Sequence, residues 1–367
     1  MAETSAPPAP LEHRFPCTNC GADYRFDPAS GMLRCDHCGQ TEPITVTTWE
    51  SAGLRELDLE RALSQELPAP ELVEVRLVSC PNCGAQVEFA PDSHASECPF
   101  CATPVVTDTG AQRRIKPRGV LAFALDEPSA RKAMTGWLGR LWFAPNGLRE
   151  FARSGRRMQG VYVPYWTFDA DTRSFYDGER GTVYYTTRTV TRNGRRVEER
   201  VANVRWSPAS GTVTRFFDDV LVLASHSLPK RYTDALEPWD LGALAPYRPQ
   251  YLAGFHAEGY TVDLGEGYGE ARARMQQVIE SDVRHDIGGD RQRVHRIETQ
   301  ISDATFKHVL LPVWMAAYKY RGKTYRLVVN GQSGRVQGER PWSVIKILFA
   351  LLVGAILLGI FAYFGNQ

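Results

Sequence analysis

The sequence predicts an α+β protein that is cysteine-rich at its N-terminus, β-rich in its centre and helical at its C-terminus. All eight cysteines of the 367-residue chain precede residue 102, as four Cys-x-x-Cys pairs. From Gly160 onward, segments in which apolar and polar residues alternate, as in β-strands, are separated by turn signals. One of these is Asn193-Gly194, the strongest short hairpin signal. Ile347 to Phe364 contains no charged or strongly polar side chain, which predicts one long apolar helix.

The cysteine-rich region is an internal duplication. The segments FPCTNCGADYRFDPASGMLRCDHCG and VSCPNCGAQVEFAPDSHASECPFCA align without a gap, each with Cys-x2-Cys-x14-Cys-x2-Cys spacing. Four thiolates are the ligand set of a closed, structural zinc site. We therefore predict two tandem zinc ribbons, at 13–48 and 78–106, each holding one structural Zn²⁺; iron is an alternative that the spacing leaves open. The predicted ligands are Cys17, Cys20, Cys35 and Cys38 in site 1 and Cys80, Cys83, Cys98 and Cys101 in site 2.

Composition and periodicity predict the segments around the ribbons. Residues 1–12, rich in Ala and Pro, are expected to be a disordered lead. Residues 49–77 are expected to be a helical linker, because leucines recur at helical spacing between 54 and 67. Residues 107–119 form a basic linker, and residues 120–340 form the α+β central domain.

Within the central domain we expect two main helices among the strands. Asp126 and Ser129 are suited to cap a helix that runs towards Trp142, and Gly288-Gly289 is suited to end a second helix over 269–285. The runs VYVPYW and VLLPVW, starting at Val161 and Val309, resemble each other and hint at a second, weaker duplication.

The apolar C-terminal run predicts a single transmembrane helix over 343–364, long enough for a hydrocarbon core of about 30 Å. Basic residues precede this run and none follow it, and the N-terminus has no signal peptide. The positive-inside rule then predicts a single-pass protein of the cytoplasmic (inner) membrane with its N-terminus in the cytoplasm, where thiols stay reduced. Small residues at four-residue spacing, such as Ala350 and Gly354, would let two spans pair as a homodimer.

Charge is divided unevenly along a chain of net charge +1. Residues 1–106 have a balance of −10 and residues 107–340 a balance of +10. Since Lys and Arg supply affinity for phosphate backbones, the acidic ribbons favour a protein partner and disfavour nucleic acid. Basic residues near the predicted span are expected to face anionic lipid of the bilayer; they are Arg113, Arg114, Lys116, Arg118, Arg340 and Lys346.

No segment carries a recognisable catalytic motif. The histidines show no metal-ligand spacing, and Ser225-His226-Ser227 lacks the G-x-S-x-G elbow. A phosphate-binding loop requires G-x4-G-K-[ST], but Ala317 stands where Gly322-Lys323-Thr324 would require a glycine. We therefore predict that the protein is not an enzyme.

With these segments placed, the chain resembles a known family. The two ribbons, the segments GVYVPYWTFDADT, LWFAPN and LPVWMAAYKYRGKTYRLVVNGQSGRVQGERP and the apolar tail are similar to those of uncharacterised bacterial membrane proteins described as TFIIB-type zinc-ribbon-containing proteins. Such proteins are often labelled as relatives of the primosomal helicase, but this chain lacks the helicase motif. The resemblance implies no activity.

Together these features predict a tail-anchored membrane adaptor or scaffold, whose acidic ribbons dock a protein partner at the cytoplasmic membrane face. The alternative is a zinc-ribbon nucleic-acid-binding protein linked to DNA replication or transcription, without its own ATPase. DNA binding by residues 1–106 alone would favour that alternative.

Overall fold

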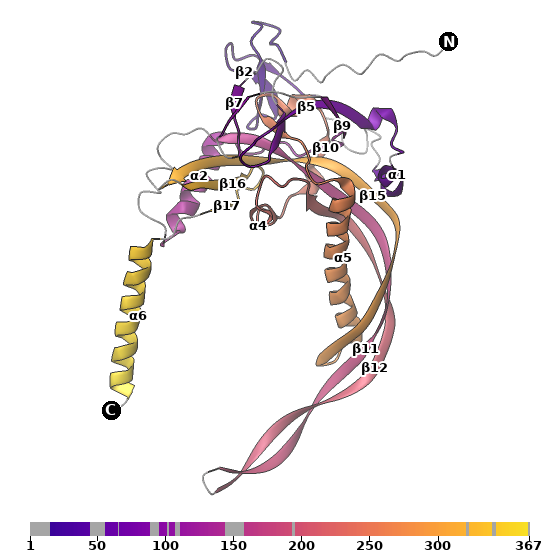
Figure 1. The fold of residues 1–367 in the computed structure, drawn as a ribbon, viewed down its shortest axis with the longest axis vertical. Helices are drawn as coiled ribbons and strands as arrows, with labels where there is room; N and C mark the ends of the chain where they lie inside the picture. Colours follow the sequence, from indigo (N-terminus) through magenta and orange to yellow (C-terminus); the bar gives the residue numbers. More distant parts are fainter. Residues whose placement is uncertain are drawn as a thin grey trace.

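The computed structural model describes residues 15–44, 56–64, 66–88, 95–100, 103–106, 111–143, 158–192, 195–320, 323–339 and 343–365. Three very long strands dominate it (Figure 1): β11 (Gln159–Arg192), β12 (Arg195–Leu223) and β15 (Arg291–Tyr320). β11 lies between β12 and β15 and pairs antiparallel with both. The predicted α+β class is therefore wrong: the chain is mostly β-sheet, because these strands, of 34, 29 and 30 residues, make up much of the central domain.

The long strands belong to one mixed sheet of twelve strands. β10 pairs parallel with β15 and β14 pairs parallel with β11, whereas the other pairings are antiparallel. The shorter members are β4 (Leu57–Asp58), β5 (Leu72–Ser79), β6 (Gln86–Glu88), β9 (Ala111–Ile115), β10 (Gly119–Val120), β13 (Ala245–Pro246), β14 (His256–Glu258), β16 (Lys323–Asn330) and β17 (Val336–Gly338).

The predicted capping residues start the first helix and end the second. Asp126 Oδ1 accepts a hydrogen bond from Ser129 N at 2.9 Å and caps α2 (Glu127–Arg140). α5 (Leu264–Ile287) ends at Gly288, which has a φ of 65°. This second helix, however, begins at Leu264 and not at 269, because Asp263 caps it: its Oδ1 accepts a hydrogen bond from Glu266 N at 2.8 Å. The remaining helical segments are α1 (Leu59–Leu63), η1 (Ala69–Glu71), α4 (Lys230–Asp234), η2 (Leu241–Ala243) and η3 (Pro249–Leu252). The helix expected between 54 and 67 is thus limited, in the described chain, to α1.

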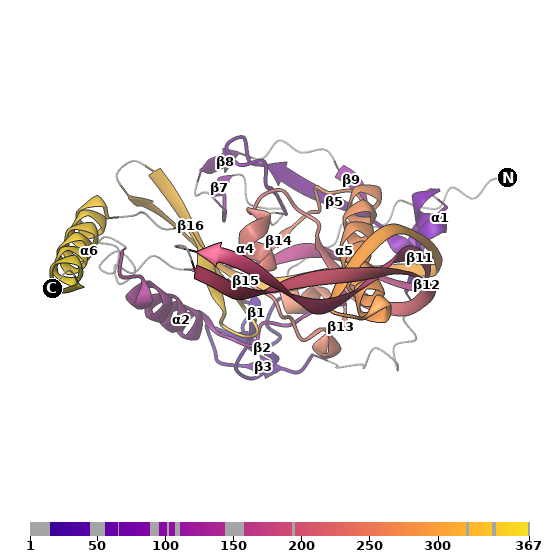
Figure 2. The same ribbon diagram turned by 90° about the horizontal axis from the view of Figure 1, so that it is seen from below.

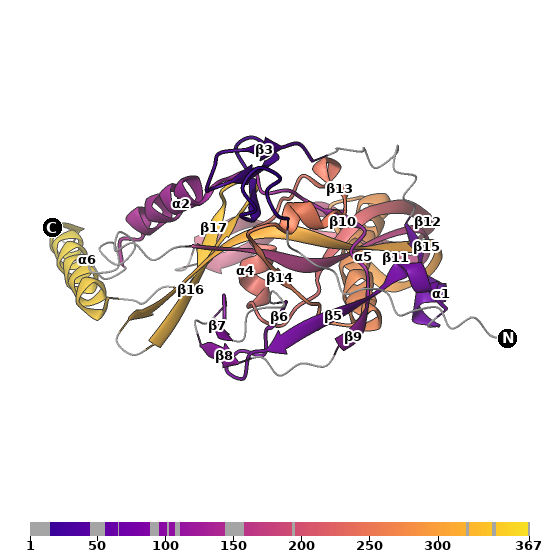
Figure 3. The same ribbon diagram turned by 90° about the horizontal axis from the view of Figure 1, so that it is seen from above.

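The runs VYVPYW and VLLPVW lie side by side in β11 and β15, with Tyr162 opposite Pro312. Side chains alternate across a strand, so these runs are buried on both faces. Tyr162 and Trp314 contribute to one apolar cluster, together with Phe26 of the first cysteine-rich unit. Val161 and Val313 contribute to the other, together with Val87 of the second unit. Figures 2 and 3 show the two units on opposite sides of this strand layer.

A third cluster lies where the long strands curve away from the body (Figure 1). α5 covers it with a stripe of buried side chains at helical spacing, including Ala271, Met275 and Ile279. Trp166 of β11 is completely buried there, and its Nε1 donates a hydrogen bond to Val262 O at 3.1 Å. α5 therefore supports the strands up to the point at which β15 begins.

The C-terminal residues form α6 (Val344–Gly365), which lies apart from the sheet in Figures 1 to 3. A transmembrane helix needs about 20 consecutive apolar residues. Across the described part of the chain, however, no helix combines the length and the apolarity needed to cross a bilayer. The predictions of a transmembrane helix over 343–364 and of a single-pass location in the cytoplasmic membrane are therefore wrong, and the homodimer predicted through that span loses its basis.

Candidate metal centre

The first cysteine-rich unit is a small three-stranded sheet with a turn at each end. β1 (Tyr24–Asp27) pairs with β2 (Met32–Cys35), which pairs with β3 (Thr41–Glu42). Each Cys-x-x-Cys pair forms the same turn: Gly21 N donates to Cys17 O at 2.8 Å, and Gly39 N donates to Cys35 O at 2.9 Å. Both glycines have a φ near 76–77°, which residues with a Cβ rarely adopt.

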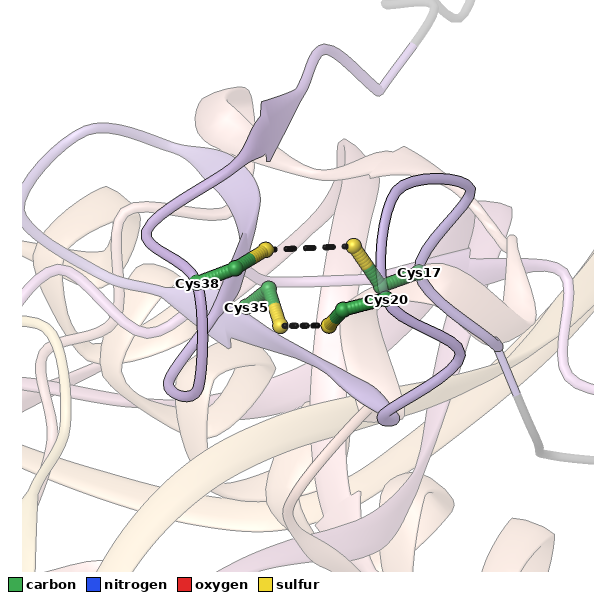
Figure 4. Close-up of side chains that lie close together, drawn as sticks. All are labelled: Cys17, Cys20, Cys35 and Cys38. Carbon is green, nitrogen blue, oxygen red and sulfur yellow. Dashed lines mark hydrogen bonds between the residues drawn. The ribbon is translucent and has the colours of Figure 1, made fainter.

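These turns bring four sulfurs together (Figure 4). The Sγ atoms of Cys17 and Cys38 are 3.6 Å apart, those of Cys20 and Cys35 are 3.5 Å apart, and all four lie within 4.8 Å of one another. A tetrahedron with metal–sulfur bonds of about 2.3 Å has edges of about 3.8 Å. The group therefore has the donor set and nearly the size of a tetrahedral metal site, so these cysteines can hold a metal ion.

The backbone of the turns favours thiolates in this group. Burial alone would raise the pKa of the Cys17 thiol, but hydrogen bonds from the backbone N–H groups of Asn19 and Cys20 lower it to about 6. The backbone N–H of Ala22 would lower the pKa of Cys20, but desolvation and the neighbouring sulfurs raise it to about 12. Four thiols this close cannot all ionise unless a cation offsets their charge.

The second unit repeats this turn. Gly84 has a φ of 73° and donates from its N–H to Cys80 O at 2.9 Å, as Gly21 does in the first unit. The sulfurs of Cys80, Cys83 and Cys98 lie within 4.8 Å of one another, and those of Cys83 and Cys98 are 3.6 Å apart. The predicted fourth ligand, Cys101, lies outside the described residues. A short hairpin of β7 (Ala95–Glu97) and β8 (Pro104–Val106) follows the first turn.

The two units are attached to the body by backbone pairing as well as apolar contact. Phe26 N donates to Ala253 O at 2.9 Å, and the Phe26 ring lies edge-on to Tyr251 at 5.5 Å. In the second unit, β6 is a strand of the main sheet and pairs with β14. The acidic residues 1–106 and the basic residues 107–340 therefore contribute to the same folded body.

The basic residues predicted to face lipid do not gather on one surface of the described chain. Arg114 donates to Tyr260 O at 2.6 Å and Gln86 Oε1 at 2.8 Å. Arg118 is largely buried and pairs with Glu71 at 2.7 Å. Lys116 is half-buried, and Lys346 Nζ donates to Trp142 O at 3.0 Å. The side chain of Arg113 and the whole of Arg340 lie outside the described residues.

Sequence reasoning missed a buried ionic cluster at the curve of the long strands. Lys307 Nζ, on β15, lies 2.5 Å from Glu56 Oε1, 2.7 Å from Asp219 Oδ1 and 3.3 Å from Asp169 Oδ2. Burial and the nearby Glu56 carboxylate raise the pKa of Asp169 to about 7. Asp169, Asp218 and Asp219 are spaced closely enough for a cation, but the Lys307 ammonium already supplies one there. Asp169 and Lys307 each follow or precede a largely apolar run, and a charged residue at such a position was the sequence signal that could have predicted a buried ion pair.

Ser225 also forms an unpredicted contact, with a carboxylate instead of its neighbour His226. Ser225 Oγ donates to Glu258 Oε1 at 2.6 Å, and both side chains are buried. Burial raises the pKa of Glu258 to about 8. His226 is exposed and has Glu266 at 3.9 Å, so these residues do not form a Ser-His-acid triad.

Comparison with known proteins adds one relative. No family model and no solved structure matches the chain. The chain is 25% identical over 342 residues, covering 91% of each protein, to "Uncharacterized protein YdjG" of Bacillus subtilis (strain 168). This protein is therefore similar to YdjG along almost its whole length.

Proposed function

We propose that this protein is a zinc-containing docking protein, without enzymatic activity, whose first ribbon helps to form a binding cleft for a cationic segment of a protein partner. The observation that carries this proposal is a cleft of about 590 Å³ between the first cysteine-rich unit and the body. Its volume lies within the range of ligand pockets, which is about 300–1,000 Å³.

The cleft is lined by both parts of the molecule. Arg25, Phe26, Asp27 and Asp36 contribute from the first unit, and Asp126, Glu127 and Trp314 are among the residues from the body. Four carboxylates against two arginines make its charge negative, and four thiolates on Zn²⁺ add a formal −2 nearby. A lysine- or arginine-rich segment is the partner that this charge and the Trp314 ring would favour.

A docking role fits the chemistry of the site better than catalysis does. A site of four cysteine ligands leaves no coordination position for a substrate. The described residues that line the cleft include no hydroxyl, thiol or amine nucleophile; its titratable groups besides the two arginines are His256 and the four carboxylates. We assign zinc in preference to iron because closed four-cysteine ribbons are its common structural site; metal analysis and the absorption spectrum of the purified chain distinguish the two.

Site-specific crosslinking in the native cells tests the docking role. A photo-crosslinking residue at Pro28, inside the cleft, should capture a discrete protein. Asp36→Lys should abolish that product, whereas Glu42→Lys, on an exposed strand of the same unit outside the cleft, should preserve it. Asp36 has only an exposed ion pair, with Arg25 at 3.4 Å, so its reversal should leave the fold intact. Identical crosslinking in both variants, or none from Pro28, would contradict the proposal.

A further inference from the structure

A two-stranded arm extends from the body at the end opposite the first ribbon (Figure 1). Pairing between β11 and β15 ends at Gly181 and Arg291, but pairing between β11 and β12 continues to Arg192 and Arg195. We define the arm as residues 182–192 and 195–205. Eleven residues per strand at about 3.3 Å each give a length of about 36 Å. Hairpins without a third strand are marginally stable in water, so contact with a partner would stabilise this one.

The arm is strongly cationic. Residues 182–205 contain six arginines and two glutamates, with no lysine or aspartate. The arginines whose side chains are described, Arg188, Arg196, Arg200 and Arg205, are all exposed. Across the described residues none of these four forms an ion pair, whereas Arg274 in the body contacts three carboxylates. The charge of the arm is therefore available to a partner.

Two of these arginines lie over tyrosine rings instead of carboxylates. The Arg200 guanidinium is 4.0 Å from the centroid of Tyr185, and the Arg205 guanidinium is 5.5 Å from that of Tyr184. Adjacent residues of a strand point to opposite faces, so each face of the arm carries one such pair. A guanidinium held over a ring keeps N–H groups at its edge for a phosphate.

The shape and polarity of the arm decide between partners. Protein interfaces are depleted of charge at their core, and residues 182–205 contain no Leu, Ile, Met or Phe. A two-stranded ribbon fits the major groove of B-form DNA, which is about 12 Å wide. Between the arginines the arm presents exposed threonines, such as Thr187 and Thr189, which can form hydrogen bonds with base edges or phosphates.

We propose that the arm binds double-stranded DNA, with its arginines contacting phosphates on both sides of a groove. We predicted that nucleic-acid binding is unlikely because the ribbons contain few Lys and Arg residues. That argument does not apply to the arm, which is rich in arginine. The binding element involves none of the residues of the ribbon cleft, and it goes beyond the docking function proposed above.

Fluorescence anisotropy of the full, zinc-loaded chain with a labelled 25-base-pair duplex tests the proposal. The arm variant replaces Arg188, Arg196, Arg200 and Arg205 with serine. A matched control variant replaces four exposed arginines of the body, Arg140, Arg173, Arg231 and Arg272. Each phosphate contact contributes about 0.9 to the slope of log affinity against log salt. The arm variant should therefore lower that slope by about 3–4 and weaken binding at least about 100-fold at low salt, whereas the control should change the affinity less than about threefold.

Two further measurements keep the result interpretable. Circular dichroism should show the same folded sheet in both variants, since none of the described residues of the arm belongs to the three apolar clusters. Tyr185→Thr, which leaves Arg200 without its ring, should weaken binding without reducing the charge. Absence of duplex binding by the unaltered chain at 50 mM salt, equal loss in the arm and control variants, or binding to vesicles of phosphatidylglycerol but not to DNA would each overturn the proposal.

Discussion

Lys307 and Asp219 form an ion pair of 2.7 Å where β12 and β15 lie on either side of β11. The Lys307 side chain is only 7% exposed. The backbone at Asp219 has a φ of 52°, and its N–H donates to Asp169 Oδ1 beside a break in the strand register. Burial would lower the pKa of Lys307, but the ion pairs with Asp219 and Glu56 raise it. The ammonium is therefore held charged at the junction of three strands.

Replacing this lysine should be severely destabilising. Lys307→Met leaves the buried Asp169 and the half-buried Glu56 and Asp219 without their cation. We therefore expect the free energy of unfolding to fall by about 3–5 kcal/mol. Urea denaturation measures it. Lys230→Met is the control, since the ion pair of Lys230 with Glu270 is substantially exposed and should contribute less than about 1 kcal/mol. If both substitutions lowered the free energy of unfolding equally, the ionic cluster around Lys307 would not stabilise the fold more than an exposed ion pair does.

Stability should also depend on pH through Asp169. Its pKa is raised from 3.8 to about 7 in the folded chain, so between these values the folded state binds a proton that the unfolded state does not. The stability from this group is therefore present below pH 4 and is lost as pH rises towards 7. We expect Asp169→Asn to remove this part of the slope when unfolding is measured between pH 5.5 and 8. Asp171→Asn, exposed on the same strand, should leave the slope unchanged.

Removing one thiolate should release one metal ion. The unaltered chain should contain two zinc ions by mass spectrometry, and Cys20→Ser should contain one, because a closed site loses most of its affinity with a missing ligand. Hydrogen exchange should quicken in β1 and β2 but not in β15, whose neighbours remain in place. Thr41→Ser, at an exposed position of the same unit, should retain both ions. Full zinc content in Cys20→Ser would argue against the first site.

Two glycines of α5 should respond in opposite directions to the same substitution. A Cβ on Gly267 would lie 2.6 Å from Trp166 Cδ1, whereas a Cβ on Gly269 would meet no atom within 4 Å. Gly267→Ala should therefore destabilise the chain by about 1–3 kcal/mol through overpacking. Gly269→Ala should stabilise it by up to about 1 kcal/mol, because alanine favours a helix. Thermal denaturation checks the sign, and a stabilising Gly267→Ala would contradict this packing.

Local features of this protein were readable from its sequence. The spacing of the cysteines predicted two groups of ligands, and the structure brings the described sulfurs of each group together at turns that contain Gly21 and Gly84. Asp126 predicted the start of α2, because a cap involves residues only three positions apart. Asn193-Gly194 predicted a hairpin, and Arg192 does pair with Arg195. Each of these depends on a few neighbouring residues.

Global features were decided only in three dimensions. The centre of the β-sheet depends on the pairing of β11 with β15, whose paired residues are more than 100 positions apart in the sequence. No local sequence pattern predicts which strands pair at that separation. The same pairing brings Asp169 to Lys307 and the two ribbons to opposite faces of the sheet. The apolar tail misled the prediction of a membrane span, since a run of apolar residues does not by itself establish a spanning helix.

Sequence by itself determined the cysteine turns and helix caps, because their contacts are local. Tertiary structure decided the sheet, the ionic cluster and the isolated arm, because those depend on which distant strands meet and where the third strand ends.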